Sequence, residues 1–332
     1  MSALLSIDRL RVELPAQRGT RTVIHDVSLD VRAGEAVALV GESGSGKSMT
    51  TRAVMRLLPE GARLSGEIRF DGVSIPGMDR RALRRWRATR VGMVFQDPRA
   101  HINPVRRIGD FLMEGARLDG RLSAGQARER VSRLMRAVGV ADVDRRLSQY
   151  PHELSGGLLQ RVMIAAALAT EPDLLLADEP TTALDVTTQE EVVAIIDELR
   201  RERGLAMLYI THDLDLAAAV CDRIAIMYAG SIVEERPAGA LTPDASHPYT
   251  RGLLAARPEI GRRESRLRTI EGRPISAFEV GDGCAFATRC PIVRDLCRRE
   301  RPAPVHVTGG RVACHFTGEG ESQAVVGDGG AR

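Results

Sequence analysis

The stretch Gly41-Glu-Ser-Gly-Ser-Gly-Lys-Ser48 decides the fold class, because it fits the pattern G-x-x-x-x-G-K-[ST]. The largely apolar run at residues 35–40 predicts a short buried strand before it, and the residues from Lys47 onward predict a helix. Glycines in such a loop let backbone N–H groups turn toward phosphate oxygens, and the helix adds the positive end of its dipole. The sequence therefore predicts a phosphate-binding loop between a parallel strand and a helix of an α/β protein.

Lys47 is the only lysine, although the chain has 47 lysines and arginines in total. A position that keeps lysine in so arginine-rich a chain indicates a need for a compact, flexible point charge. We expect Lys47 to reach the β- and γ-phosphates of a nucleotide and the Ser48 hydroxyl to bind Mg²⁺. The residues expected to hold the phosphates are Gly41, Ser43, Gly44, Ser45, Gly46, Lys47, Ser48 and Met49.

Composition is that of a globular protein of one large or two ordinary domains. The chain has 332 residues, 43% of them hydrophobic and 27% charged. No apolar run approaches the roughly 18 residues of a spanning helix, and residues 1–8 lack the pattern of a secretion signal. The net charge of +3 gives no argument for nucleic acid. We therefore expect a cytosolic chain.

The pattern along the chain predicts an α/β core interrupted by helices. Strands are expected at residues 4–14, 23–31, 35–40, 66–70, 91–95, 173–177, 205–210 and 224–228, and helices at 188–203 and 214–220. An arginine-rich helical pattern fills residues 104–150, which indicates a helical subdomain at about 104–170. We place a nucleotide-binding domain at residues 1–258, an extension with four cysteines at 259–317 and a disordered tail at 318–332.

A second half of the site is indicated by two carboxylates and a serine–glycine turn. Asp178 and Glu179 end the apolar strand at 173–177. An acidic pair can be a solvated turn, but beside a phosphate loop it predicts Asp178 in the Mg²⁺ shell and Glu179 orienting or deprotonating water. Ser155 precedes a predicted helix with Gly156 and Gly157, a second anion-binding pattern. A single ATP does not need two anion-binding sites from one chain. Two chains facing each other could therefore sandwich each ATP between the phosphate loop of one and this segment of the other.

The whole set of motifs resembles the nucleotide-binding subunits of ABC transporters over about residues 4–258. The resemblance implies a P-loop ATPase core with an antiparallel β subdomain and a helical subdomain. It implies that Gln96 contacts the metal or the attacking water, and that His212 contacts the γ-phosphate and holds Glu179. The Mg²⁺ ligands would be Ser48, Gln96 and Asp178. Residues expected to meet the opposite chain are Ser155, Gly156, Gly157 and Gln160 at its ATP, and Asp185.

One feature departs from that family, in which an aromatic residue before the second strand often stacks on adenine. The stretch Arg18-Gly-Thr-Arg-Thr-Val23 contains no aromatic residue. A guanidinium plane can also stack on a base, so Arg18 or Arg21 could replace the ring.

Two segments resemble one branch of the family, the importers of dipeptides, oligopeptides and nickel. They are Ser246-His-Pro-Tyr-Thr250 and the tail from Cys284 to Cys314. Leu158-Leu159 lies in residues 154–160, which match the signature segment of the family. This pair is more typical of the nickel and metallophore importers, whereas the long cysteine tail favours peptide importers. We therefore expect a peptide as the substrate and keep nickel or a metallophore as the alternative.

The tail spaces Cys284, Cys290, Cys297 and Cys314 as C-x5-C-x6-C-x16-C. This pattern lacks the tight pair that a structural zinc site usually contains. Loosely spaced thiolates can hold a [4Fe–4S] cluster, which some members of the branch carry. Reduced or disulfide-paired thiols and zinc are the alternatives. Cys221 is expected to be a small buried residue.

The resemblance implies an ATPase motor bound peripherally to the cytoplasmic face of the membrane. Its expected partners are two transmembrane permease subunits, a second ATPase subunit that is a related chain, and an extracytoplasmic substrate-binding protein. A soluble ABC-type ATPase acting on DNA or ribosomes is the alternative of another class. The sequence has no N-K-x-D segment to read guanine, which excludes a typical GTPase.

Overall fold

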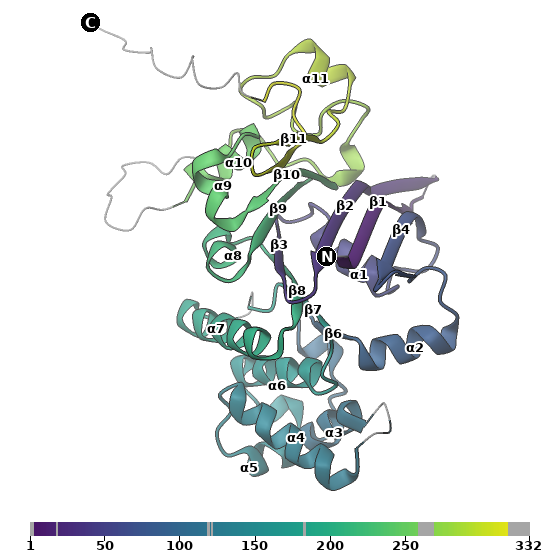
Figure 1. Cartoon of the computed structure of the whole chain (residues 1–332), viewed down its shortest axis with the longest axis vertical. Helices are drawn as coiled ribbons and strands as arrows, with labels where there is room; N and C mark the ends of the chain where they lie inside the picture. The colour runs from purple at the N-terminus through teal and green to yellow at the C-terminus, as the bar shows by residue number, and fades with distance from the viewer. Residues whose placement is uncertain are drawn as a thin grey trace, which may run out of the picture.

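The computed structural model describes residues 3–17, 19–117, 120, 122–181, 184–257 and 269–317. The tail predicted to be disordered at 318–332 and the residue Arg18 lie outside this part. Within it, a small antiparallel sheet and a helical lobe lie on different sides of a large mixed sheet (Figure 1).

The antiparallel sheet has the order β2-β1-β4-β5. Its strands are β1 Ala3–Pro15, β2 Thr20–Arg32, β4 Arg63–Phe70 and β5 Val73–Ser74. Apolar side chains on one face, among them Leu5, Ile7 and Val12, are buried in one core with Ala53 and Val54 of α1 Lys47–Val54. This alternation is what an antiparallel sheet with one solvated face requires.

The mixed sheet has the order β11-β12-β10-β9-β3-β8-β7-β6. Its strands are β3 Ala36–Val40, β6 Val91–Val94, β7 Leu174–Asp178, β8 Ala206–Thr211, β9 Arg223–Tyr228, β10 Ser231–Pro237, β11 Val305–Val307 and β12 Gly310–Val312. The strands from β9 to β6 pair in parallel, and every residue of β3, β6, β7 and β8 is buried. A parallel sheet covered on both faces explains these unbroken apolar runs. The carboxyl ends of the strands then gather the loops predicted to carry chemistry.

The helical lobe contains α3 Ile108–Arg117, α4 Ala124–Ala137, α5 Val143–Ser148 and α6 Gly156–Leu168, at the bottom of Figure 1. Serines start two of these helices: Ser123 forms a capping box with Gln126, and the Ser155 side chain accepts from the backbone N–H of Leu158. The other helices are α2 Arg80–Thr89, α7 Val186–Arg203, α8 Leu214–Val220, α9 Ala238–Asp244, α10 Pro248–Ala255 and α11 Asp295–Arg299, with 3₁₀ turns η1 Arg99–His101, η2 Pro151–Glu153 and η3 Ala277–Glu279.

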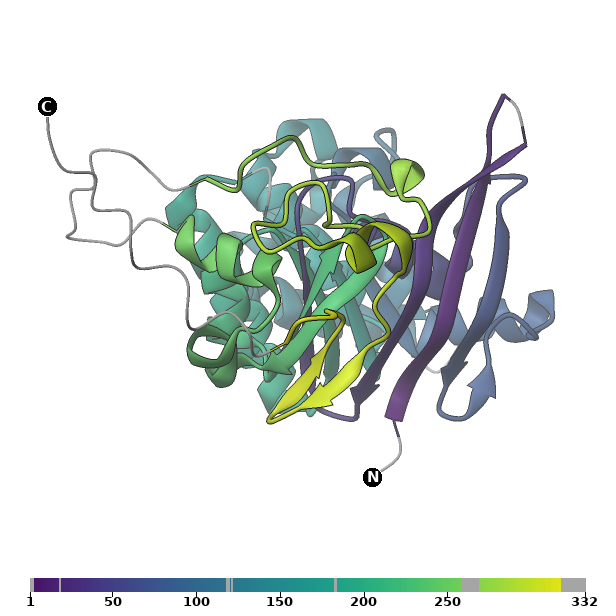
Figure 2. The same cartoon turned by 90° about the horizontal axis from the view of Figure 1, so that it is seen from above.

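The described part of the extension, residues 269–317, adds strands to the mixed sheet. Glu234 and Glu235 of β10 pair with Val312 and Arg311 of β12, so the core sheet continues into the extension. Figure 2 shows this segment lying across β10 and reaching toward β2. The extension is therefore built onto the core through backbone hydrogen bonds, which the sequence pattern alone did not indicate.

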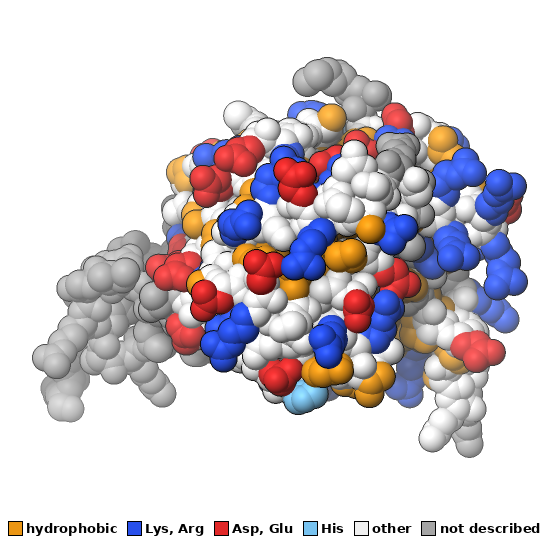
Figure 3. Space-filling model, turned by 90° about the horizontal axis from the view of Figure 1, so that it is seen from below, with side chains coloured by type: hydrophobic (Ala, Val, Ile, Leu, Met, Phe, Trp, Pro, Cys, Tyr) orange, Lys and Arg blue, Asp and Glu red, His pale blue; other side chains and the backbone are white. Residues whose placement is uncertain are grey.

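Figure 3 shows one face of the molecule, on which basic and acidic side chains are interspersed over the middle and basic side chains gather along the right-hand edge. Among the described helices, none is long and apolar enough to cross a membrane.

Candidate nucleotide site

The phosphate loop follows β3 and leads into α1, as the sequence predicts. Two of its glycines are required by backbone packing: a Cβ on Gly41 would lie 2.1 Å from the Met227 carbonyl oxygen, and Gly46 has φ of 105°. The Ser45 side chain is 4% exposed, and its hydroxyl has no hydrogen-bond partner within the described chain. A buried hydroxyl left without a partner in this loop fits a ligand that supplies an acceptor there.

Lys47 folds back over the loop. Its Nζ donates to the carbonyl oxygens of Gly41 at 2.8 Å and Glu42 at 3.0 Å, and it lies 3.7 Å from Glu179 Oε1. Burial lowers the pKa of Lys47, and the carboxylates of Glu179 and Asp178 oppose that shift. The ammonium is thus held between the loop and the acidic pair, where a phosphate oxygen can take over its hydrogen bonds.

Ser48 and Asp178 meet directly: the Ser48 hydroxyl donates to Asp178 Oδ1 at 2.7 Å. Asp178 is 2% exposed, and burial raises its pKa, whereas the hydrogen bond from Ser48 lowers it. Two hard oxygen donors brought together beside a phosphate loop suit Mg²⁺. The residues present therefore fit the predicted metal.

Glu179 is the point on which the predicted catalytic residues converge. Gln96 Nε2 donates to Glu179 Oε2 at 3.1 Å, and His212 Nδ1 lies 3.7 Å from the same oxygen. Together with Lys47, these side chains come from four separate loops at the carboxyl ends of β3, β6, β7 and β8. Glu179 also has φ of 45°, a sparsely populated conformation for a residue other than glycine, which turns the chain away from β7.

The signature residues lie at a different surface, around the start of α6. Neither Gly156 nor Gly157 has a tight contact that forbids a side chain: a Cβ on Gly156 would meet nothing within 4 Å, and one on Gly157 would lie 3.5 Å from Thr188 Cγ2. The Asp185 side chain accepts from the Thr188 N–H at 3.0 Å and so caps α7. The two predicted partner-facing segments are therefore neighbours.

Gln160 lies inside its own chain. Its side chain is 2% exposed, and its amide donates to the Pro180 carbonyl oxygen at 2.6 Å. The bond joins α6 to the turn after Glu179, so Gln160 positions that turn in this structure.

A cationic residue that the sequence analysis did not single out contacts the phosphate loop. The two terminal nitrogens of Arg289 lie 2.8 Å and 3.3 Å from the Glu42 carboxylate oxygens, and the Arg289 side chain is only 3% exposed. The Tyr249 hydroxyl accepts from the Glu42 N–H at 3.1 Å. Glu42 is an interior position of the motif, and these contacts span 247 and 207 residues, so no local pattern could have pointed to them.

The four extension cysteines all lie in the described part of the chain, but they are not grouped there as metal ligands. All five cysteines of the chain are free thiols, and Cys221 is buried as predicted. Burial raises the pKa of Cys284 to about 11 and also raises the pKa values of Cys290 and Cys314, which favours the protonated thiol. Among the described residues, no group of three or more His, Cys, Asp or Glu side chains is placed to hold a metal ion. The geometry gives the predicted cluster no support.

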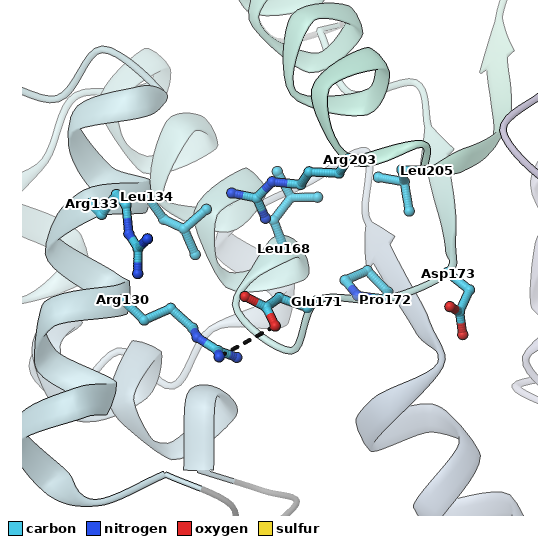
Figure 4. A pocket seen from close by; sticks show the side chains of 9 residues that line it. All are labelled: Arg130, Arg133, Leu134, Leu168, Glu171, Pro172, Asp173, Arg203 and Leu205. Carbon is cyan, nitrogen blue, oxygen red and sulfur yellow. Dashed lines mark ion pairs between the residues drawn. The ribbon is translucent and has the colours of Figure 1, made fainter.

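A separate hollow lies between the helical lobe and the residues just before β7 and β8 (Figure 4). Arg130, Arg133 and Arg203 line it together with Glu171, and Arg130 pairs with Glu171 at 3.3 Å. It lies at the start of β7, whereas Asp178 ends that strand. This hollow is therefore distinct from the nucleotide site.

Two protein families match this chain. The family described as "ABC transporter" matches residues 24–182, and "Oligopeptide/dipeptide transporter, C-terminal region" matches residues 233–297. The "Oligopeptide transport ATP-binding protein OppD" of Salmonella typhimurium is 41% identical over 313 residues, which cover 94% of this chain and 93% of the relative. A "Probable peptide ABC transporter ATP-binding protein" of Sinorhizobium fredii is 41% identical over 93% of both chains.

Solved structures with the same fold include a dimeric ATP-binding cassette bound to ADP and Pi. It has a TM-score of 0.64 and 27% identity, and the match covers 70% of this chain and 98% of that one. The structure titled as cbiO1 from Clostridium perfringens, part of an ABC transporter complex, has a TM-score of 0.62 and 26% identity over 74% of this chain and 92% of that one. These matches establish the P-loop ATPase fold with antiparallel and helical parts.

Proposed function

The chain belongs to the ATP-binding subunits of ABC transporters, in the branch with the oligopeptide/dipeptide C-terminal region, and from this premise we propose how its residues do their work. It is the ATP-hydrolysing motor of a peptide importer. The observation that carries the proposed mechanism is the convergence of Gln96, His212 and Lys47 on the carboxylate of Glu179.

In our mechanism the phosphate loop and Lys47 bind the β- and γ-phosphates of ATP. Mg²⁺ held by Ser48, Asp178 and Gln96 would neutralise charge on the phosphates. Glu179 accepts a proton from the attacking water, while His212 fixes the Glu179 carboxylate and contacts the γ-phosphate. Gln96 connects this centre to the helical lobe that begins beyond β6, so ATP occupancy is communicated to that lobe.

A second ATPase subunit completes each site in this proposal. A side chain on Gly41 or Gly46 would collide with atoms of the same chain. Gly156 and Gly157 have no such close contact. Two bare glycines and Ser155 at the start of α6 leave backbone N–H groups open to an anion from another chain. The related cassette whose title describes a dimer bound to ADP and Pi is consistent with this arrangement. We propose that the partner is a related chain, giving a heterodimer.

The remaining partners follow from the importer architecture. An importer of this class combines membrane permeases with a substrate-binding protein, and the ATPase subunit lies on the cytoplasmic side of the membrane. We propose that this chain attaches peripherally to two permeases through the helical lobe. Closure of the ATPase pair would move the permeases, and hydrolysis at Glu179 would reopen it.

We propose di- and oligopeptides as the cargo. The test is uptake in cells that lack this gene, restored with either the wild-type chain or Glu179→Gln. Labelled di- and tripeptides are compared with free and chelated nickel. Peptide uptake that returns only with the wild type supports the proposal, and nickel uptake instead would replace it with the metal importer.

The [4Fe–4S] cluster on Cys284, Cys290, Cys297 and Cys314 stays a proposal that rests on the cysteine spacing and on the resemblance to a branch in which some members carry one. Its test is purification without oxygen, followed by iron analysis and the visible absorption spectrum. Cys290→Ser should bleach the absorption while ATP binding persists. A colourless, iron-free wild type would refute the cluster.

A further inference from the structure

The extension presents an exposed aromatic ring near the phosphate loop. Phe278 lies in η3, its exposed fraction is 45%, and the Arg21 guanidinium lies over the ring at 5.9 Å from its centroid. Aromatic rings and guanidinium planes are the side-chain groups on which nucleobases stack. The pair therefore has the chemistry of a base platform.

The turn that carries this ring is tied to the phosphate loop through Gly230. The Gly230 N–H donates to the Ser45 carbonyl oxygen at 2.8 Å, and a Cβ on Gly230 would lie 3.2 Å from Ala277 Cβ. His25 Nε2 lies 2.9 Å from the Ala277 carbonyl oxygen and holds the turn against β2. Gly230 therefore lies between Ser45 of the phosphate loop and Ala277, the residue that precedes Phe278.

Phe278 and Arg21 also border a hollow of about 970 Å³. Its other lining residues are Leu14, Pro15, Ala16 and Gln17 at the turn between β1 and β2. None of these is aromatic, so Phe278 is the one aromatic ring among the lining residues. A nucleotide held by its phosphates at the loop can direct its base into this hollow.

We propose that Phe278, backed by Arg21, is the platform on which the purine of the bound nucleotide stacks. The extension then supplies part of the nucleotide site. The turn between β1 and β2 has no aromatic residue, and Phe278, about 260 residues further along the chain, provides the ring instead. The inference rests on nucleotide binding at the phosphate loop, which the proposed function shares.

The experiment compares two ligands on the full chain, ATP and inorganic tripolyphosphate, which has no base. Phe278→Ala and Phe278→Leu should weaken ATP binding by about tenfold, since stacking on an aromatic ring contributes at this level. Their affinity for tripolyphosphate should not change. The matched control is Val305→Ala, which alters an apolar side chain of similar exposure, 43%, elsewhere in the extension.

A third variant, Phe278→Trp, keeps an aromatic plane and adds a fluorophore. Its emission should be quenched by ATP and not by tripolyphosphate, and the single natural tryptophan, Trp86, is only 5% exposed and gives the background. Equal weakening of both ligands by Phe278→Ala, unchanged ATP affinity, or no quenching would overturn the platform. A wild-type chain that binds neither ligand would instead refute nucleotide binding at the loop.

Discussion

The phosphate loop and the C-terminal extension contribute to the same site in opposite ways. The chemistry of the loop is recognisable from eight consecutive residues, 41–48. Two of its glycines, Gly41 and Gly46, lie against Met227 of β9, where a Cβ would be too close. The extension contains a cysteine pattern that suggests a metal, yet its clearest contact with the site is a buried arginine, Arg289, on Glu42. The comparison teaches that local motifs identify the reaction, while the residues that hold the motif in shape can come from anywhere in the chain.

The largest expected effect is the loss of ATP hydrolysis when the proposed base, Glu179, is replaced. Glu179→Gln should lower ATP hydrolysis by about 10²- to 10⁴-fold, because a positioned base contributes at this level. ATP binding should persist, since the loop and Lys47 are untouched. The measurement is phosphate release together with nucleotide affinity, with the exposed Glu198→Gln as the control. Wild-type turnover in the variant would remove Glu179 from the proposed role.

A smaller effect is expected at the start of α6, where Gly156 has no contact within its own chain that requires a glycine, unlike Gly41 in the phosphate loop. Gly156→Ala should leave the melting temperature unchanged, because its Cβ would meet no atom within 4 Å. Turnover of the assembled pair should fall about 10- to 100-fold through loss of access to the partner's phosphates. Gly125→Ala is the matched control, since it also has open space near the start of a helix. Loss of folding with Gly156→Ala would mean that the glycine serves its own chain.

The link between the two regions is tested by Arg289→Ala. Removing this arginine leaves the Glu42 carboxylate unpaired beside bound phosphates, so ATP affinity should fall about tenfold, and stability by about 2–4 kcal/mol. Glu42→Gln should recover part of the ATP affinity in the double variant, whereas loss of packing alone would not be rescued. The exposed Arg298→Ala provides the control. Additive losses in the double-mutant cycle would show that the two side chains are not coupled.

The smallest effect concerns the pH dependence set by His247, whose ring centroid lies 5.8 Å from that of Phe286 in the extension. His247 caps α10, and burial lowers its pKa to about 4, below its ordinary value of 6.5. The unfolded chain therefore takes up a proton as pH falls below about 6.5 while the folded chain does not, so stability declines until about pH 4. His247→Asn keeps a capping oxygen and should flatten this decline by up to about 3 kcal/mol. Denaturant unfolding at several pH values measures it, with the exposed His152→Asn as the control, and an unchanged slope would contradict the assignment.

Much of the fold could be predicted because its signals are local. A short local pattern is enough to predict each of three features. They are the strand before the phosphate loop, the serine that starts α6 and the acidic pair at the end of β7. The meeting of Gln96, Glu179 and His212 follows from the rule that parallel strands bring their carboxyl ends to one edge. The packing of Phe278 and Arg289 against the core could not be predicted, because long-range contacts leave no periodicity in the sequence.

The structure gives no support to the metal cluster predicted on the four extension cysteines. Cysteine spacing shows which thiols are available, but their mutual placement decides whether they can bind one ion together. Among the described residues, no group of three or more His, Cys, Asp or Glu side chains is placed to do so. The extension is instead joined to the core through β12 and through the Arg289–Glu42 pair.

The single lysine has a practical consequence. In a chain whose other basic side chains are arginines, acylating reagents find one side-chain amine, and that amine is the one predicted to bind phosphate. Lys47 is only 4% exposed and is held by the carbonyl oxygens of Gly41 and Glu42. The mass added to the peptide that contains Lys47, followed over time with and without nucleotide, would report how much of the site is occupied without any change to the sequence.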